Sequence, residues 1–307
     1  MPKSAIPDRI LTRGPTRFGE FTVRGDTRHL LGRQPASQLG LQSLTDVSLD
    51  CTYTSAMANS PDHPSASDEA RAQLTPTGVL RAGINMGNIL LVTGRTPNGE
   101  PDGVAPDMAR AIAERLGVPV RLVPFNTPGE LGDAVDLDEW DIGLIGAEPQ
   151  RAEKIEFTPA YAEIEATYLV PAGSPVQTIA DVDHPGIRIS VYGRSAYGLW
   201  LERNIQLATL VRAESTEAAL IQFLAGGIDV LAGLRAALVD EVQKLPGARV
   251  IDGQFATVQQ AVGTAKKNRA GASFLRSFVQ EAVASGLVTN LIARHEVDGR
   301  LSVANLI

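Results

Sequence analysis

The sequence predicts an α/β protein made of two lobes joined by two crossing strands. Short apolar runs alternate with amphipathic stretches twice, first over 79–145 and again over 187–251. Such alternation is typical of parallel sheets covered by helices. Extended segments near 162–175 and 253–265 separate the two sets. The chain of 307 residues has room for two ordinary domains, at roughly 150 residues each.

The composition excludes several classes of protein. With 44% hydrophobic residues, 21% charged residues and a net charge of −7, the chain is typical of a soluble globular protein. No apolar run reaches the roughly 20 residues that span a bilayer. The acidic balance, without a basic stripe, argues against a nucleic-acid partner. A single cysteine, Cys51, and four histidines without ligand spacing lead us to expect no disulfide, metal or cofactor.

Residues 1–66 differ from the rest of the chain. Their apolar residues are scattered, with neither a helical nor a strand period, and residues 58–68 form a polar linker rich in Pro and Ser. We expect 1–66 to be a disordered or loosely attached extension. No secretory signal is visible in it.

The first set of elements begins with Ser67, which is expected to cap a helix over 68–74. The clearest helix covers 104–116, where Val104, Met108, Ile112 and Leu116 recur at helical spacing before Gly117. The remaining predictions in this set are strands over 79–84, 118–125 and 142–145, a turn at 97–99, and a helix over 128–137 begun by Thr127.

The second set contains a helix capped by Ser215, with Ala219, Leu220, Phe223 and Leu224 as its expected apolar stripe. Strands are predicted over 166–170, 187–192, 208–212, 229–232, 249–251 and 258–265, and helices over 195–203, 216–225, 236–244, 270–285 and 287–294. We therefore expect one lobe made of 67–170 plus 256–307 and a second made of 171–255. The ligand cleft is expected between them, where strands end in loops.

Arg151 is the first candidate for a binding residue. The predicted strand 142–145 ends at Gly146, and the short loop 147–150 leads to this arginine. A guanidinium offers a rigid fork of donors that fits a carboxylate. The alternative is that Arg151 is a solvated surface residue.

Several short sequence blocks stand out along the chain, at 78–83, 103–109, 113–118, 140–146, 151–153, 155–161, 193–196 and 226–230. Together these blocks resemble the family 3 extracellular solute-binding proteins, the polar-amino-acid receptors of bacterial ABC transporters. They keep the family's order, and the resemblance covers about 75–295. It implies a periplasmic-binding-protein-like type II fold that closes on a small solute, an amino acid or a related carboxylate.

The resemblance also implies an ABC permease as partner, and we expect a monomer. The family works in the periplasm, whereas the chain as given shows no export signal and, if complete, would stay in the cytoplasm.

The resemblance assigns roles by matching position. Arg151 would hold the ligand's carboxylate, and Ser195, at a helix N-terminus, would supply an anion-binding edge. The complete set of expected ligand-binding residues is Asn85, Asn88, Ala147, Glu148, Arg151, Tyr192, Ser195 and Ala196.

One departure from the family concerns the ligand's amino group. Leu234 falls where the family has an Asp that takes the ammonium, and an ammonium left unpaired in a dry cleft is costly. Glu148 either replaces that charge or is a surface loop residue.

Two other functions remain open. One is a dehydratase-like enzyme of the same fold, of the prephenate or arogenate type, using Glu130, Glu148 and Arg151. The other is a sensor or partner-binding module. We do not expect an enzyme, because no nucleophile has an obvious base partner. Tyr192 and Tyr197 either face the cleft or pack in the core, and Trp200 is expected to pack in the core.

Overall fold

The computed structural model describes residues 66–305, all within one compact unit. The expected extension 1–66 lies, except for Ala66, outside the described residues. The main sheet has the strand order β4-β1-β5-β12-β7-β10-β8-β9, with β6, β11 and β13 paired at its margins. This mixed α/β arrangement confirms the predicted fold class.

The first group of elements surrounds a parallel sheet of three strands. Strand β1 (Leu80–Asn85) pairs with β4 (Val120–Phe125) on one side and β5 (Ile142–Gly146) on the other. The other elements of this group are α2 (Asp68–Leu74), β2 (Gly94–Arg95), β3 (Pro101–Asp102), α3 (Val104–Leu116), α4 (Pro128–Asp133), η1 (Ala134–Leu137), η2 (Arg151–Glu153) and β6 (Ile155–Phe157). We call the part built on β4, β1 and β5 the first lobe.

The second group repeats this pattern. Strand β8 (Arg188–Tyr192) pairs in parallel with β9 (Thr209–Ala213) and β10 (Val230–Leu234). The other elements of this group are η3 (Ile179–Asp181), α5 (Ala196–Asn204), α6 (Thr216–Leu224), α7 (Arg235–Val242) and β11 (Arg249–Val250). We call this part the second lobe.

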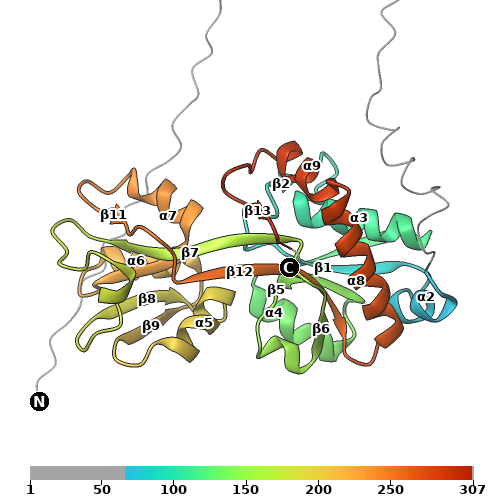
Figure 1. The fold of residues 1–307 in the computed structure, drawn as a ribbon, viewed down its shortest axis with the longest axis horizontal. Helices are drawn as coiled ribbons and strands as arrows, with labels where there is room; N and C mark the ends of the chain where they lie inside the picture. Colours follow the sequence, from blue (N-terminus) through green and yellow to red (C-terminus); the bar gives the residue numbers. More distant parts are fainter. Residues whose placement is uncertain (1–65, 306–307) are drawn as a thin grey trace, which may run out of the picture. The chain divides into compact units, whose positions relative to one another are not determined.

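Two long antiparallel strands connect the groups (Figure 1). Strand β7 (Ala162–Val170) pairs with β10, and β12 (Ala256–Ala265) pairs with both β5 and β7. The chain then returns through α8 (Arg269–Ala284), α9 (Leu287–Arg294) and β13 (Ser302–Val303). The lobe boundaries 67–170 plus 256–307 and 171–255 stay a prediction.

Local signals set several helix ends as predicted. The Ser67 and Ser215 side chains accept hydrogen bonds from the amides three residues on, at the starts of α2 and α6. Helix α3 ends at Gly117, whose φ of 67° is left-handed, a conformation that glycine adopts without the penalty of a Cβ.

Other predictions were wrong in detail. The helix predicted over 128–137 divides into α4 and a 3-10 turn. Leu224 does not belong to the apolar stripe of α6, since 54% of it is exposed. Strand β7 begins at Ala162 instead of Ala166, and β6 and β13 were not predicted.

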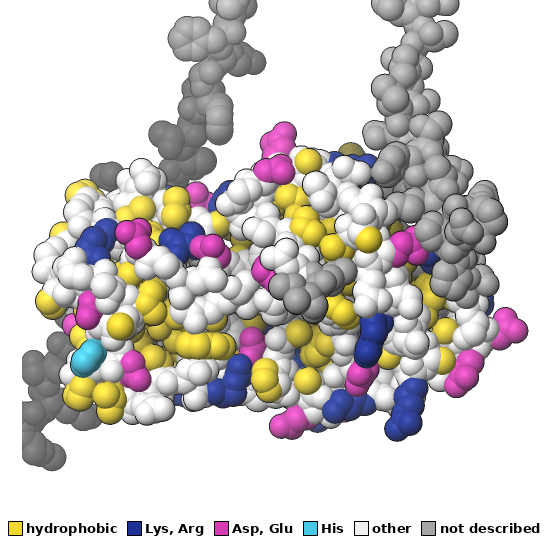
Figure 2. Space-filling model, viewed as in Figure 1, with side chains coloured by type: hydrophobic (Ala, Val, Ile, Leu, Met, Phe, Trp, Pro, Cys, Tyr) yellow, Lys and Arg dark blue, Asp and Glu magenta, His cyan; other side chains and the backbone are white. Residues whose placement is uncertain are grey.

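None of the described helices is both long and apolar enough to cross a membrane. On the face in Figure 2, acidic and basic side chains of the described residues are interspersed.

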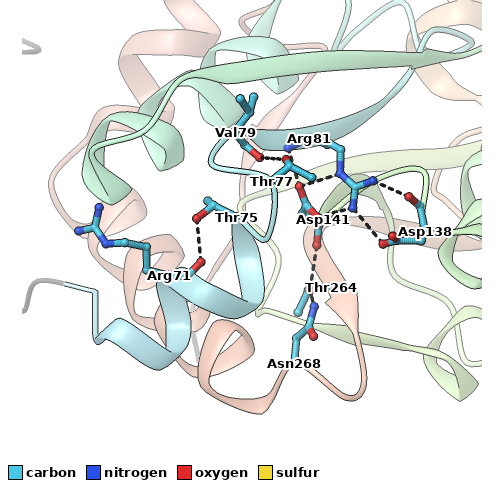
Figure 3. A network of polar contacts seen from close by, with 9 residues as sticks. All are labelled: Arg71, Thr75, Thr77, Val79, Arg81, Asp138, Asp141, Thr264 and Asn268. Atoms are coloured by element: carbon cyan, nitrogen blue, oxygen red, sulfur yellow. Dashed lines mark hydrogen bonds and ion pairs between the residues drawn. The ribbon is translucent and has the colours of Figure 1, made fainter.

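A buried ion pair joins β1 to β5 (Figure 3). Arg81 Nη2 donates to Asp141 Oδ1 at 2.7 Å, and Arg81 Nε donates to Oδ2 at 3.1 Å. The Asp141 carbonyl in turn accepts from the Thr264 hydroxyl of β12 at 2.8 Å. The pairing with Asp141 raises the pKa of Arg81 above its usual value. These contacts fix the strands whose opposite ends form the site described below.

Replacing Asp141 with asparagine is expected to reduce the free energy of unfolding by about 2 to 3 kcal/mol, because charged hydrogen bonds to Arg81 are lost. Urea denaturation measures this loss. Glu241→Gln is the control: it removes the exposed pair with Lys244 and should cost less than about 1 kcal/mol. Equal effects of the two substitutions would contradict the role given to Asp141.

Candidate functional site

A cavity of about 140 Å³ lies where the two lobes and β12 meet. It is lined by residues that follow strand ends, by the first turns of helices and by β12. The lining residues are Asn85, Gly87, Asn88, Ile89, Pro128, Gly146, Arg151, Tyr192, Ser195, Ala196, Tyr197, Thr216, Leu234, Ala237, Val258 and Gln260. The set includes all the predicted site residues except Ala147 and Glu148.

Close packing between β5 and α5 narrows the cavity. A Cβ on Gly146, the last residue of β5, would lie 2.9 Å from the Ala196 Cβ and 3.2 Å from Val258 Cγ1. Any larger residue would therefore displace α5 from the end of β5.

Arg151 is buried at the edge of this cavity, with only 8% of its surface exposed. Its Nη1 donates to the Gly146 carbonyl at 2.7 Å, and its Nη2 donates to the Arg194 carbonyl of the second lobe at 2.8 Å. No carboxylate among the described residues lies within ion-pair distance of it. Burial lowers the pKa of Arg151 to about 10. The interpretation of Arg151 as a solvated surface residue was wrong.

The start of α5 lies beside this guanidinium, because Arg194 directly precedes its N-cap. The Ser195 hydroxyl donates to the Tyr192 carbonyl at 2.6 Å and accepts from the Gly198 amide at 3.0 Å. The hydroxyl proton is thus already used within the protein. The amide groups of Ala196 and Tyr197 have no hydrogen-bond acceptor among the described residues, so they can donate to an anion.

Glu148 lies outside the cavity lining and is held from the second lobe. Its carboxylate accepts from Arg203 Nη2 at 2.5 Å, while Arg203 Nη1 donates to Gln150 Oε1 at 2.5 Å. Burial raises the pKa of Glu148, and the pairing with Arg203 partly opposes that shift. Only 7% of Glu148 is exposed, so it is not a surface residue. The structure does not bring it, or Ala147, to the cavity.

Two tyrosines line the cavity from the second lobe. Burial raises the pKa of Tyr197 to about 12, although hydrogen bonding to Ser195 and Thr216 opposes the shift. Tyr192, hydrogen-bonded to Thr127, also has a raised pKa because of burial. Both hydroxyls stay neutral at ordinary pH. Trp200 is half-buried, and its ring lies 5.3 Å from that of Phe255.

The catalytic set considered from the sequence is not assembled. Glu130 is exposed and completes a capping box at α4 by accepting from the Thr127 amide at 3.2 Å. Glu148 pairs with Arg203, and neither carboxylate lines the cavity with Arg151.

Sequence reasoning missed several lining residues: Pro128, Thr216, Ala237, Val258 and Gln260. Gln260 is a polar residue at a buried position of β12, but its neighbour Gln259 is polar as well, so the sequence alone does not distinguish it. The others come from separate elements, and no local pattern marks them.

Away from the cavity, Asp102, Asp107 and His295 lie close enough to share an ion, with ligand atoms within 4.8 Å of one another. Asp107 already pairs with Arg110 at 2.9 Å and with His295 at 2.8 Å. Its negative charge therefore has partners within the protein.

Solved structures with the same fold are numerous. ArgBP from T. maritima, as a mutant, is 20% identical with a TM-score of 0.61, and the match covers 75% of this chain and 100% of that one. The ancestral amino acid-binding protein AncCDT-1, a precursor of cyclohexadienyl dehydratase, is 19% identical with a TM-score of 0.59, covering 73% and 98%. The substrate binding protein of an amino acid ABC transporter is 18% identical with a TM-score of 0.58, covering 71% and 98%.

A search of curated protein sequences found no match. The model of the bacterial extracellular solute-binding proteins, family 3, matches residues 83–296, which contain every residue that lines the cavity. The chain belongs to this family of solute-binding proteins.

Proposed function

We propose that the chain binds a small carboxylate-bearing solute in this cavity, with the two lobes closing around it. The observation that carries the proposal is the buried Arg151, whose hydrogen-bond acceptors in the protein are neutral carbonyls. Burying a charge without a counter-ion costs several kcal/mol. A ligand carboxylate would supply the missing negative charge.

The start of α5 supports the same position for the carboxylate. Arg151 Nη2 is bonded to the residue just before the N-cap of α5, so the guanidinium and the free amide of Ala196 are close together. A helix N-terminus carries partial positive charge. One carboxylate could accept from both, which would link the lobes through the ligand.

Direct contacts between the lobes support closure. Besides Arg151, Arg203 of α5 contacts Glu148, and Arg194 Nη2 donates to Asp133 Oδ1 of α4 at 2.7 Å. These groups can come together only when the lobes approach, as in hinge closure. In this arrangement Arg203 acts as a clasp outside the cavity.

Family membership supports an ABC permease as the partner of the loaded protein. The solved relatives are described as binding proteins for amino acids, which supports a solute of similar size. One of them is a precursor of a dehydratase, which keeps an enzyme of this fold as the second candidate. The uncommitted acid that such catalysis needs is not found among the described cavity residues.

The central test is Arg151→Gln. A thermal-shift screen of the full chain would use pyruvate, L-lactate, succinate and the common L-amino acids as probes. A ligand present at 100 times its Kd should raise Tm by about 5 to 10 °C, and Arg151→Gln should abolish that rise. The control is Arg121→Gln, at an exposed arginine of β4. A ligand-induced rise that persists in Arg151→Gln would refute the carboxylate site.

Closure is tested by Arg203→Gln, which leaves every cavity-lining residue unchanged. Loss of the contacts to Glu148 and Gln150 should disfavour the closed arrangement. The affinity for the ligand found in the screen should therefore fall by about three- to tenfold. Isothermal titration calorimetry measures this change. Arg212→Gln is the matched control, because its partner Glu202 lies in the same lobe. Equal affinities of the two variants would argue against the clasp.

A further inference from the structure

We infer that the solute is a small monocarboxylate with an uncharged oxygen substituent, a 2-oxo or 2-hydroxy acid, and that it carries no ammonium group. The inference rests on the proposed function, since it names the class of carboxylate that the same cavity would accept. The charges, hydrogen-bonding groups and size of the cavity each support it.

The charged side chains among the described lining residues are positive only. Arg151 is the cation of the lining, and no Asp or Glu is among the described residues that line the cavity. An amino acid would bring one negative and one positive charge into this space. The carboxylate would be matched by Arg151, whereas the ammonium would face neutral groups and a buried cation. A charged group desolvated in this way is far more costly than a neutral one.

The part of the cavity wall formed by Leu234 and Ala237 is apolar, although an acid there could have paired with an ammonium. Leu234 ends β10, and it lines the cavity with Ala237 of the first turn of α7. Leu234 is the N-cap of α7 and makes no side-chain capping bond. Helices α5 and α7 therefore both begin at this cavity, and both helix N-termini contribute positive potential. This field opposes an ammonium and favours an oxygen.

The two asparagines of the lining offer donors rather than acceptors to the cavity. Asn85 Oδ1 accepts from the Gly87 amide at 3.1 Å, and Asn88 Oδ1 accepts from the Leu90 amide at 3.2 Å. The side-chain NH₂ groups of both asparagines make no hydrogen bond to a described residue. Free NH₂ donors match a carbonyl or hydroxyl oxygen. An ammonium, which only donates, would find both asparagine carbonyls in use, and Gln260 Oε1 would offer it a neutral acceptor without a countercharge.

The size of the cavity limits the rest of the molecule. Its volume of about 140 Å³ is close to the ~150 Å³ of an apolar cavity that admits benzene. Ile89, Pro128 and Val258 add apolar surface to the lining. A tail of a few carbon atoms fits these limits.

Calorimetric titration of the full chain with acids of matched skeleton tests the inference. The probes are 2-oxoisovalerate, 2-hydroxyisovalerate, isovalerate and L-valine, together with pyruvate, L-lactate and L-alanine. The first four probes form a five-carbon set and the last three a three-carbon set. In at least one of these sets, the oxo or hydroxy acid should bind at least about 100-fold more tightly than the amino acid. In the five-carbon set it should also bind more tightly than isovalerate.

The outcomes distinguish this inference from the proposed function. An amino acid that binds as tightly as its oxo and hydroxy analogues, and loses binding in Arg151→Gln, would overturn the inference and leave the carboxylate site standing. Isovalerate binding equal to that of its oxygenated analogues would overturn the assignment of the oxygen. Failure of every acid to bind would overturn both proposals.

Leu234→Asp tests the charge argument directly. It places an acid on the apolar wall, at an N-cap position that favours Asp, and should shift the preference from the oxo acid toward L-valine by at least about tenfold. Leu234→Asn caps equally well without the charge and should leave the preference unshifted. Leu224→Asp, at the exposed position of α6, controls for added charge elsewhere. A preference unchanged in Leu234→Asp would count against the inference.

Discussion

A buried guanidinium without an acidic partner is the constraint on which the site depends. Neutral carbonyls of Gly146 and Arg194 satisfy two hydrogen bonds of Arg151, and the acid whose charge acts most on it, Glu148, is already paired with Arg203. Because these carbonyls belong to different lobes, the group that would attract an anion also ties α5 to the end of β5. In the proposed function, one side chain would therefore serve both the binding of the solute and part of the contact between the lobes.

Much of the fold could be predicted because helix ends carry local signals. Ser67, Ser215 and Gly117 cap their helices through bonds or backbone conformations that involve only neighbouring residues. Strands β6 and β13 could not be predicted, because such short segments become strands only by pairing with β12 and β7. The exposure of Leu224 likewise depends on how α6 lies on its sheet, which helical spacing alone does not determine.

The expected site residues that line the cavity include two that a strand end and a helix start mark in the sequence. Arg151 and Ser195 follow such signals, and both line the cavity. The partner of Glu148, in contrast, is 55 residues away along the chain, and nothing near Glu148 in sequence indicates it. The same holds for Thr216 and Gln260, which reach the cavity from elements that are distant in sequence. Contacts between residues distant in sequence therefore determine where these side chains lie, and the local sequence pattern does not reveal them.

The neighbouring arginines explain why the site carries a single positive charge. Arg235 follows Leu234 directly, yet its guanidinium pairs with Glu165 of β7 and does not line the cavity. Arg194 turns its side chain to Asp133 and to the Gly129 carbonyl. Each of these cations forms an ion pair with an acid outside the cavity lining, whereas no acid among the described residues lies within ion-pair distance of Arg151. The lining holds one cation, Arg151, which would balance one carboxylate of the proposed solute, so a second acidic group on that solute would be left without a counter-ion.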